Sequence, residues 1–168
     1  MYDKDLLNDL FAAMIEWFAG DPKRIQHFAK VHSLARLIGV QENLGRDELF
    51  ALETAAYVHD IGIRPGEELY NRNDGKIQEE LGPGCAEKLL SALKFPEETI
   101  KRASYLVGRH HTYSNITEPD LRILVEADLL VNLYEDGASE AAVRSAYDKI
   151  FVTESGRRIC RTMFGIKE

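Results

Sequence analysis

Cysteine is scarce in this sequence, since Cys85 and Cys160 are the only two among 168 residues. They can form at most one disulfide, and they exclude a zinc site built from several cysteines. Long hydrophobic runs are also missing, because no apolar stretch approaches the ~20 residues that a membrane-spanning helix requires. The N-terminus, MYDKD, has neither the basic start nor the apolar run of a signal peptide. We therefore expect a cytoplasmic protein with reduced thiols and no membrane partner.

Positive charge is in deficit, because 21 Lys and Arg residues face 28 Asp and Glu residues, for a net charge of −7. A nucleic-acid polymer is a poor expected partner, since such binding sites need clustered Lys and Arg. One small phosphorylated ligand needs only a few bases and stays compatible with this balance. The arginine-containing tail ESGRRICRTMFGI is interpreted as a packing helix with a basic outer face.

The alternation of polar and apolar residues that is typical of strands is missing, whereas helical periodicity occurs in most of the chain. The sequence predicts an all-α protein, a single helical-bundle domain over residues 1–168 with about seven or eight helices. The expected helices cover residues 3–19, 22–38, 46–59, 83–93, 96–110, 119–134 and 139–151, with a short eighth helix after Gly156. Residues 61–80 are expected to be irregular, because glycine, proline and asparagine interrupt them repeatedly.

Helical periodicity places ionisable side chains on the apolar faces of four expected helices. These residues are His27, His59 with Asp60, His110 with His111, and Asp128. Each one alone fits a hydrogen-bonded core residue, but several buried charges in one core need a common neutralising partner. A divalent cation is such a partner, since imidazole and carboxylate are its usual ligands. His32 lies about 140° around its helix from His27 and is expected to face elsewhere.

The order His27, then His59-Asp60, then Asp128 resembles the H…HD…D signature of the HD superfamily of metal-dependent phosphohydrolases. The segments HFAKVHSLARLIG, ETAAYVHDIG and ILVEADLLVNLYE are similar to the segments that carry this signature in the family. The resemblance covers residues 22–135 and implies an HD-type helical domain. It also implies that His27, His59, Asp60 and Asp128 bind one divalent ion, with Mn, Mg, Fe, Ni, Co and Zn all left open.

Other positions qualify the resemblance. His110 and His111 match a region where some members place ligands of a second metal or contacts to phosphate, and which of the two points inward is left open. Gln78 stands where two-metal members carry a further histidine, so one tightly bound metal is expected. Ile63 stands where the nucleotidase branch has a glutamate, so the mechanism of that branch is not implied.

The function that follows is hydrolysis of a phosphomonoester or phosphodiester in a small molecule, with a nucleotide as the favoured class. Asp60 and His110 or His111 are the expected catalytic residues. Asp60 is expected to orient or deprotonate the attacking water, and His110 or His111 to stabilise charge or protonate the leaving oxygen. The expected substrate contacts are Arg64, Arg72, Lys76, Arg109 and Asn132. Glu126 is expected to face solvent. The alternatives are a metal-containing module that senses a nucleotide and a structural helical module without turnover. A homodimer is compatible with the enzyme and with both alternatives.

Overall fold

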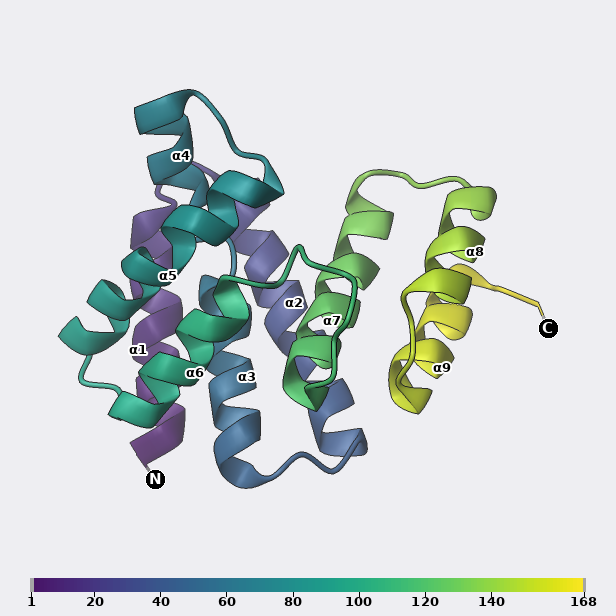
Figure 1. The fold of residues 1–168 in the computed structure, drawn as a ribbon, viewed down its shortest axis with the longest axis horizontal. Helices are drawn as coiled ribbons and strands as arrows, with labels where there is room; N and C mark the ends of the chain where they lie inside the picture. Colours follow the sequence, from purple (N-terminus) through teal and green to yellow (C-terminus); the bar gives the residue numbers. More distant parts are fainter. Residues whose placement is uncertain (1, 168) are drawn as a thin grey trace.

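Nine α-helices make up the described part of the chain, residues 2–167, in a computed structural model (Figure 1). They are α1 Tyr2–Trp17, α2 Pro22–Gln41, α3 Arg46–Val58, α4 Ile63–Tyr70, α5 Gly75–Ala92, α6 Glu97–Val107, α7 Pro119–Glu135, α8 Glu140–Lys149 and α9 Glu154–Phe164. Residues 2–167 contain no strand, which confirms the all-α class expected from the sequence. Cys85 and Cys160 are both free thiols.

Local signals in the sequence account for many of the helix boundaries. Asp21 caps α2 by accepting a hydrogen bond from the backbone N–H of Arg24, and Pro22 occupies the first turn of that helix. Ser139 and Thr153 cap α8 and α9 through their side chains in the same way. Such caps satisfy N–H groups that have no partner within the helix, so they fix where a helix begins.

The segment expected to be irregular, residues 61–80, contains α4 and the first turns of α5. Two of its expected breakers, Gly62 and Gly66, are close-packing positions. A Cβ atom on Gly62 would lie 2.9 Å from the backbone nitrogen of Gly82, and one on Gly66 would lie 2.6 Å from the backbone oxygen of Arg72. Asn71 ends α4 in the left-handed region with φ 53°, and Asp74 then caps α5. Helix α5 consequently begins well before Pro83, which lies inside it. Glycine here serves close approach between backbones, a role that a single sequence does not distinguish from a loop.

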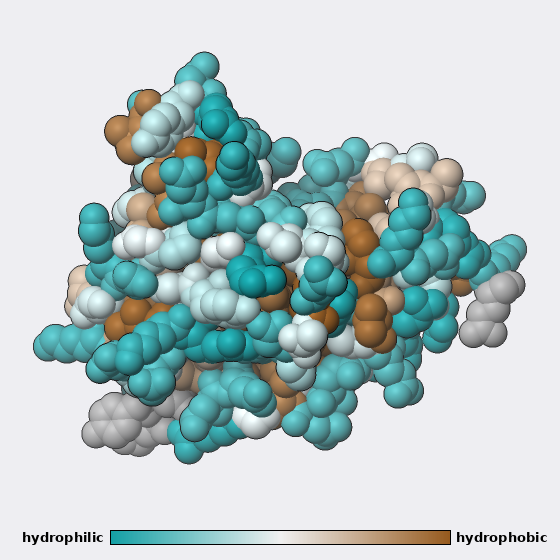
Figure 2. All heavy atoms as spheres, viewed as in Figure 1, coloured by the Kyte–Doolittle hydropathy of each residue, from teal (hydrophilic) through white to brown (hydrophobic). Residues whose placement is uncertain are grey.

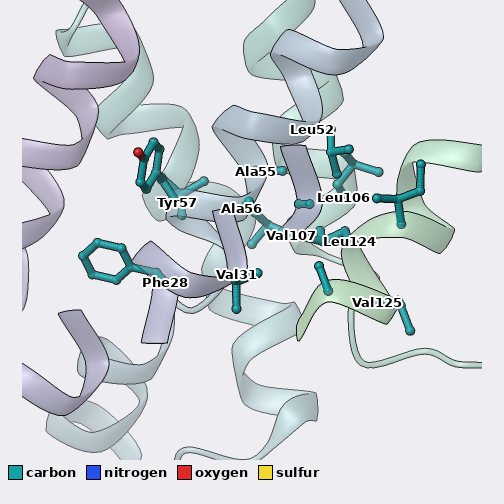
Figure 3. Close-up of a cluster of buried hydrophobic side chains, with 14 of the residues drawn as sticks. Phe28, Val31, Leu52, Ala55, Ala56, Tyr57, Leu106, Val107, Leu124 and Val125 are labelled. Atoms are coloured by element: carbon teal, nitrogen blue, oxygen red, sulfur yellow. The ribbon is translucent and has the colours of Figure 1, made fainter. Parts of the chain in front are cut away.

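The hydrophobic core lies where α2, α3, α6 and α7 meet (Figure 3). Helix α2 packs against both α3 and α7, and α3 packs against α6. The buried side chains at this junction include Phe28, Val31, Leu52, Ala55, Ala56, Leu106, Val107, Leu124 and Val125. Alanines on α3 let the neighbouring helices approach closely, and this arrangement fixes where α2, α3 and α7 place their polar residues.

Helices α8 and α9 form a pair beside α7, on the side away from α1 and α5 (Figure 1). The face of the molecule in Figure 2 is largely hydrophilic, with hydrophobic side chains visible at α4 and along the boundary between α7 and the α8–α9 pair. Within residues 2–167, none of the helices combines the length and the apolar character needed to cross a bilayer.

The expectation that Glu126 faces solvent is wrong, because this side chain is completely buried under the segment that leads into α9. Its carboxylate accepts hydrogen bonds from the backbone N–H groups of Val152 and Thr153, at 2.7 and 3.0 Å, and from the Thr153 hydroxyl. Periodicity correctly turns Glu126 away from Asp128, but the far side of α7 is covered by the C-terminal helices. The carboxylate therefore connects α7 to the start of α9.

Candidate metal centre

Three helices bring the predicted ligand set together. His27 lies in the second turn of α2, His59 and Asp60 follow directly after α3, and Asp128 lies in the middle of α7. His27 Nε2 is 3.2 Å from His59 Nε2, 3.1 Å from Asp128 Oδ1 and 3.4 Å from Asp60 Oδ2. His59 Nε2 is 3.4 Å from the same oxygens of Asp60 and Asp128. The four side chains thus present their donor atoms to one small volume.

These separations fit coordination of a single ion. Neighbouring donor atoms around one ion with bonds of about 2.0–2.2 Å lie about 2.8–3.6 Å apart in tetrahedral or octahedral geometry. The cluster is also shielded from water, since His27, His59 and Asp128 are 6%, 0% and 3% exposed. Two imidazole nitrogens that face each other at 3.2 Å need a proton or a cation between them. The set is therefore suited to a divalent cation.

The histidine rings are oriented by hydrogen bonds on their outer nitrogens. His59 and His110 each donate from Nδ1 to the backbone carbonyl of the residue three positions earlier, at 2.8 and 2.7 Å. His27 Nδ1 lies 3.0 Å from Glu135 Oε2. A donor role for Nδ1 leaves Nε2 with its lone pair in the neutral ring, which is the form that binds metals. All three rings thus turn Nε2 toward the cluster.

Of the two adjacent histidines after α6, it is His110 that points inward. It is completely buried, and its Nε2 has no hydrogen-bond partner within residues 2–167 and lies 3.6 Å from Asp60 Oδ1. Such an unpaired buried nitrogen calls for an ion, water or substrate nearby. His111 Nε2 instead lies 3.1 Å from Gln78 Oε1, and the Gln78 amide donates to the Asn73 carbonyl at 2.7 Å. The side chain that lies beside His111 is therefore the amide of Gln78, with its oxygen facing the ring.

Asp60, His110 and His111 form a second group that could hold a cation, with one donor atom from each lying within 4.8 Å of the others. Asp60 belongs to both groups, because His27 and His59 face its Oδ2 while His110 faces its Oδ1. The carboxylate of Asp60 therefore bridges the principal cluster and the pair of adjacent histidines.

Electrostatics within the cluster favour ionised carboxylates. Burial is the largest single effect and would raise the pKa of Asp60, but His59, His110 and His27 together outweigh it and lower the pKa to about 2. Burial would likewise lower the pKa of His59, but Asp60 and Asp128 raise it to about 9. Burial and the adjacent His110 lower the pKa of His111 to about 4, so that ring is neutral near pH 7. A cation entering the cluster must displace protons from imidazole, so its affinity decreases as the pH falls.

Three of the expected substrate contacts lie in the segment that follows the His59-Asp60 doublet. The guanidinium of Arg64 donates to the Trp17 carbonyl of α1, and the exposed Arg72 pairs with Asp74 at 2.7 Å. Lys76 is exposed as well. Arg64 and Arg72 are thus engaged with Trp17 and Asp74, and the role of all three bases in substrate binding stays a prediction.

The remaining two expected contacts flank the cluster in sequence. Arg109 directly precedes His110 and is half-buried, with its guanidinium carbon 5.6 Å from the centre of the Tyr105 ring. Asn132 is half-buried one turn after Asp128 on α7. Their role in substrate binding stays a prediction too.

The fifth histidine lies outside the cluster, as its position on the helix predicts. His32 Nε2 is 3.1 Å from Glu53 Oε1, and the ring stacks on Tyr57 with 4.0 Å between centroids. It connects α2 and α3 within the helical core.

Two charged residues at the site were not identified from the sequence. Arg24 lies one turn before His27 and binds Glu67 of α4 with both terminal nitrogens, at 3.1 and 2.6 Å. The pKa of Arg24 is raised chiefly by this pair, with a smaller contribution from the charge of Asp60. Glu135 follows Asp128 by seven residues, which is close to two helical turns and returns to the same face. That spacing is the signal that could have identified Glu135.

Comparisons with known proteins agree with this arrangement. The HD domain family matches residues 24–133 of the chain. The crystal structure of a predicted HD superfamily hydrolase from an uncultured Thermotogales bacterium is similar in fold, with a TM-score of 0.66 and 24% sequence identity over 94% of this chain and 84% of that one. No curated protein matches the chain. Because the family match spans more than half of the chain and includes every residue of the cluster, the chain belongs to the HD domain family.

Proposed function

We propose that this protein is a metal-dependent phosphohydrolase that cleaves a phosphate ester of a small molecule, with a nucleotide as the favoured substrate class. The observation that carries the proposal is the convergence of donor atoms from His27, His59, Asp60 and Asp128 within 3.4 Å of His27 or His59. Two carboxylates and two imidazoles are a ligand set that first-row divalent ions accept. When bound, such an ion lowers the pKa of water and neutralises charge on a phosphoryl oxygen.

The residues of the chain have distinct tasks in this proposal. His27, His59 and Asp128 hold the ion, and Asp60 both binds it and faces His110 with its second oxygen. Asp60 is therefore placed to accept the proton of the attacking water while the water oxygen bonds to phosphorus. His110 Nε2, which is otherwise unpaired, is placed to hold a proton for the leaving oxygen as its bond to phosphorus breaks.

The experiment that tests the proposal is a turnover assay with defined metals. The purified protein is stripped of metal, reloaded with Mn²⁺, Mg²⁺, Fe²⁺, Ni²⁺, Co²⁺ or Zn²⁺, and assayed against phosphomonoesters, phosphodiesters and nucleotides. We expect metal-dependent hydrolysis of at least one phosphate ester. Binding of a nucleotide without turnover under any of these conditions would instead support a sensing module.

Removal of the metal is expected to lower thermal stability reversibly. At a free metal concentration about 100 times Kd, binding stabilises the folded state by about 2.7 kcal/mol, which raises Tm by about 5–10 °C for a domain of this size. Calorimetry with and without a chelator measures the shift, and restoring the metal must restore Tm. An unchanged Tm would argue against an ion in this cluster.

We expect one tightly held metal per chain, because Gln78 offers an amide oxygen beside His111 where an imidazole would be a better ligand. Metal analysis after extensive dialysis should give a ratio near one. Gln78→His is expected to raise the ratio toward two by completing the group around Asp60, His110 and His111. A ratio near two in the parent protein would contradict the prediction and assign His110 and His111 to a second site.

A further inference from the structure

We propose that Glu135, the last residue of α7, is a positioning residue that holds His27 with its Nε2 directed at the metal. This inference rests on the proposed function, since it concerns how that metal centre is held. Glu135 is outside the set of residues that the sequence pointed to, and it has no place among the four donors.

The contacts of Glu135 assign each of its oxygens to one partner. Oε2 lies 3.0 Å from His27 Nδ1, and Oε1 lies 2.7 Å from Lys30 Nζ. Lys30 follows His27 by three residues on α2, so both partners lie on the same face of that helix. The side chain of Glu135 is 12% exposed, which shields its bond to His27 from competition with water. Because Lys30 restrains one oxygen, the other is kept in place as an acceptor for the imidazole.

Helix α7 contacts the His27 ring at both nitrogens. Asp128 Oδ1 lies 3.1 Å from Nε2, and Glu135 Oε2 lies 3.0 Å from Nδ1. The two carboxylates have different tasks. Asp128 is one of the four proposed metal ligands and also faces His59. Among the histidines of the cluster, Glu135 contacts only His27, and it does so at the outer edge of the ring. A carboxylate that accepts from Nδ1–H fixes the tautomer in which Nε2 carries the lone pair, and it increases the basicity of that nitrogen.

Helix stability does not explain a glutamate at this position. Carboxylates near the C-terminus of a helix are disfavoured by the helix dipole, and α7 has no basic residue in its last turn. The compensating charges come from another helix, through Lys30 and the His27 ring. The placement is therefore explained by what Glu135 does for His27, and not by what it does for α7.

His59 and His110 have a backbone carbonyl in the corresponding role, which no side-chain substitution removes. His27 is thus the histidine of the cluster whose orientation depends on a replaceable group. Without Glu135 the ring can rotate or change tautomer, and we expect metal affinity to fall about 10- to 100-fold, as is usual when such a partner is lost.

The test compares four variants in the full chain. Glu135→Ala removes the acceptor, Glu135→Gln keeps an acceptor oxygen without the charge, Lys30→Met removes the group that restrains Glu135, and Asp136→Ala removes an exposed neighbouring carboxylate as a matched control. Zn²⁺ affinity is measured by competition with a chelating indicator. Imidazole ¹⁵N chemical shifts of the zinc-loaded protein report the tautomer of His27, a readout that loss of a merely structural contact does not change.

We expect Glu135→Ala to weaken Zn²⁺ binding about 10- to 100-fold and to alter the His27 ¹⁵N shifts. Glu135→Gln should bind Zn²⁺ more tightly than Glu135→Ala and should recover most of the parent affinity. In Glu135→Gln the amide NH₂ group faces the Lys30 ammonium, so combining it with Lys30→Met should recover the affinity more fully. Asp136→Ala should bind like the parent. If Glu135→Ala fails to fold, the inference is tested with Glu135→Gln and Lys30→Met. In that case the Zn²⁺ affinity and the His27 ¹⁵N shifts of these two variants are compared with those of the parent.

The inference is overturned if Glu135→Ala binds Zn²⁺ within about twofold of the parent and keeps the parent His27 shifts. It is equally overturned if Glu135→Ala is weakened but the His27 shifts are those of the parent, because the loss then does not pass through the ring. Failure of the proposed function is a separate result, since the parent protein itself would then bind no metal or hydrolyse no phosphate ester.

Discussion

Asp128→Asn is expected to reduce phosphate-ester hydrolysis by about 1,000-fold or more, equivalent to about 4 kcal/mol of transition-state stabilisation. The substitution keeps the volume of the side chain but removes the charge of an oxygen that lies 3.1 Å from His27 Nε2 and 3.4 Å from His59 Nε2. A neutral amide compensates a divalent cation poorly, so metal affinity should fall about 100-fold or more. Helix content should persist, because the surrounding core is aliphatic. Metal analysis, turnover and circular dichroism measure the three effects separately.

A matched control lies on the same helix. Asp120 is also a buried carboxylate of α7, but it pairs with Arg102 at 2.6 Å instead of with the cluster histidines. Asp120→Asn should lower stability by weakening that ion pair, while metal content and turnover of the folded protein stay close to those of the parent. Equal loss of metal in both variants would mean that α7 as a whole had moved, and undiminished turnover in Asp128→Asn would remove Asp128 from the ligand set.

Glu126→Ala is expected to lower the free energy of unfolding by about 3 kcal/mol, and Tm by about 6–12 °C. The variant leaves the N–H groups of Val152 and Thr153 and the Thr153 hydroxyl without their buried acceptor. Gly156 is packed closely against the same carboxylate, so the deletion also opens a cavity at the start of α9. Denaturant unfolding of the parent and the variant measures the difference.

Glu126→Gln is the control that keeps an acceptor oxygen, and it should recover a substantial part of the lost stability. Metal affinity should stay close to that of the parent in both variants, because Glu126 lies on the side of α7 opposite to Asp128. A change in unfolding free energy below about 1 kcal/mol would show that water satisfies the donors in place of Glu126. Asp128→Asn and Glu126→Ala, two residues apart on α7, are thus expected to have different effects. The first should reduce metal binding and turnover, and the second should reduce the free energy of unfolding.

The sequence determined the helices and the order of the candidate ligands, since both are local features. Asp21 with Pro22 marks the start of α2, and apolar periodicity turns His27 and Asp128 inward while it turns His32 away. Those signals involve neighbours within a few residues, which a single sequence displays directly. The doublet of His59 and Asp60 at the end of an alanine-rich helix is likewise visible without any knowledge of packing.

Tertiary structure decided the features that depend on which helices meet. Periodicity does not tell whether the polar side of a helix faces water or another element, so the burial of Glu126 follows only from the position of α9. Adjacent residues such as His110 and His111 differ by about 100° at the end of a helix, where the last turn sets the direction. Gly62 is interpreted from the sequence as a breaker, and only the fold shows that its backbone packs closely against that of Gly82. Glu135 acquires its role only because α2 packs on α7 and brings His27 and Lys30 within reach of one carboxylate. The sequence thus specifies which charged side chains are present. Contacts between helices that are far apart in the chain determine which partner each charged side chain binds, and therefore what it does.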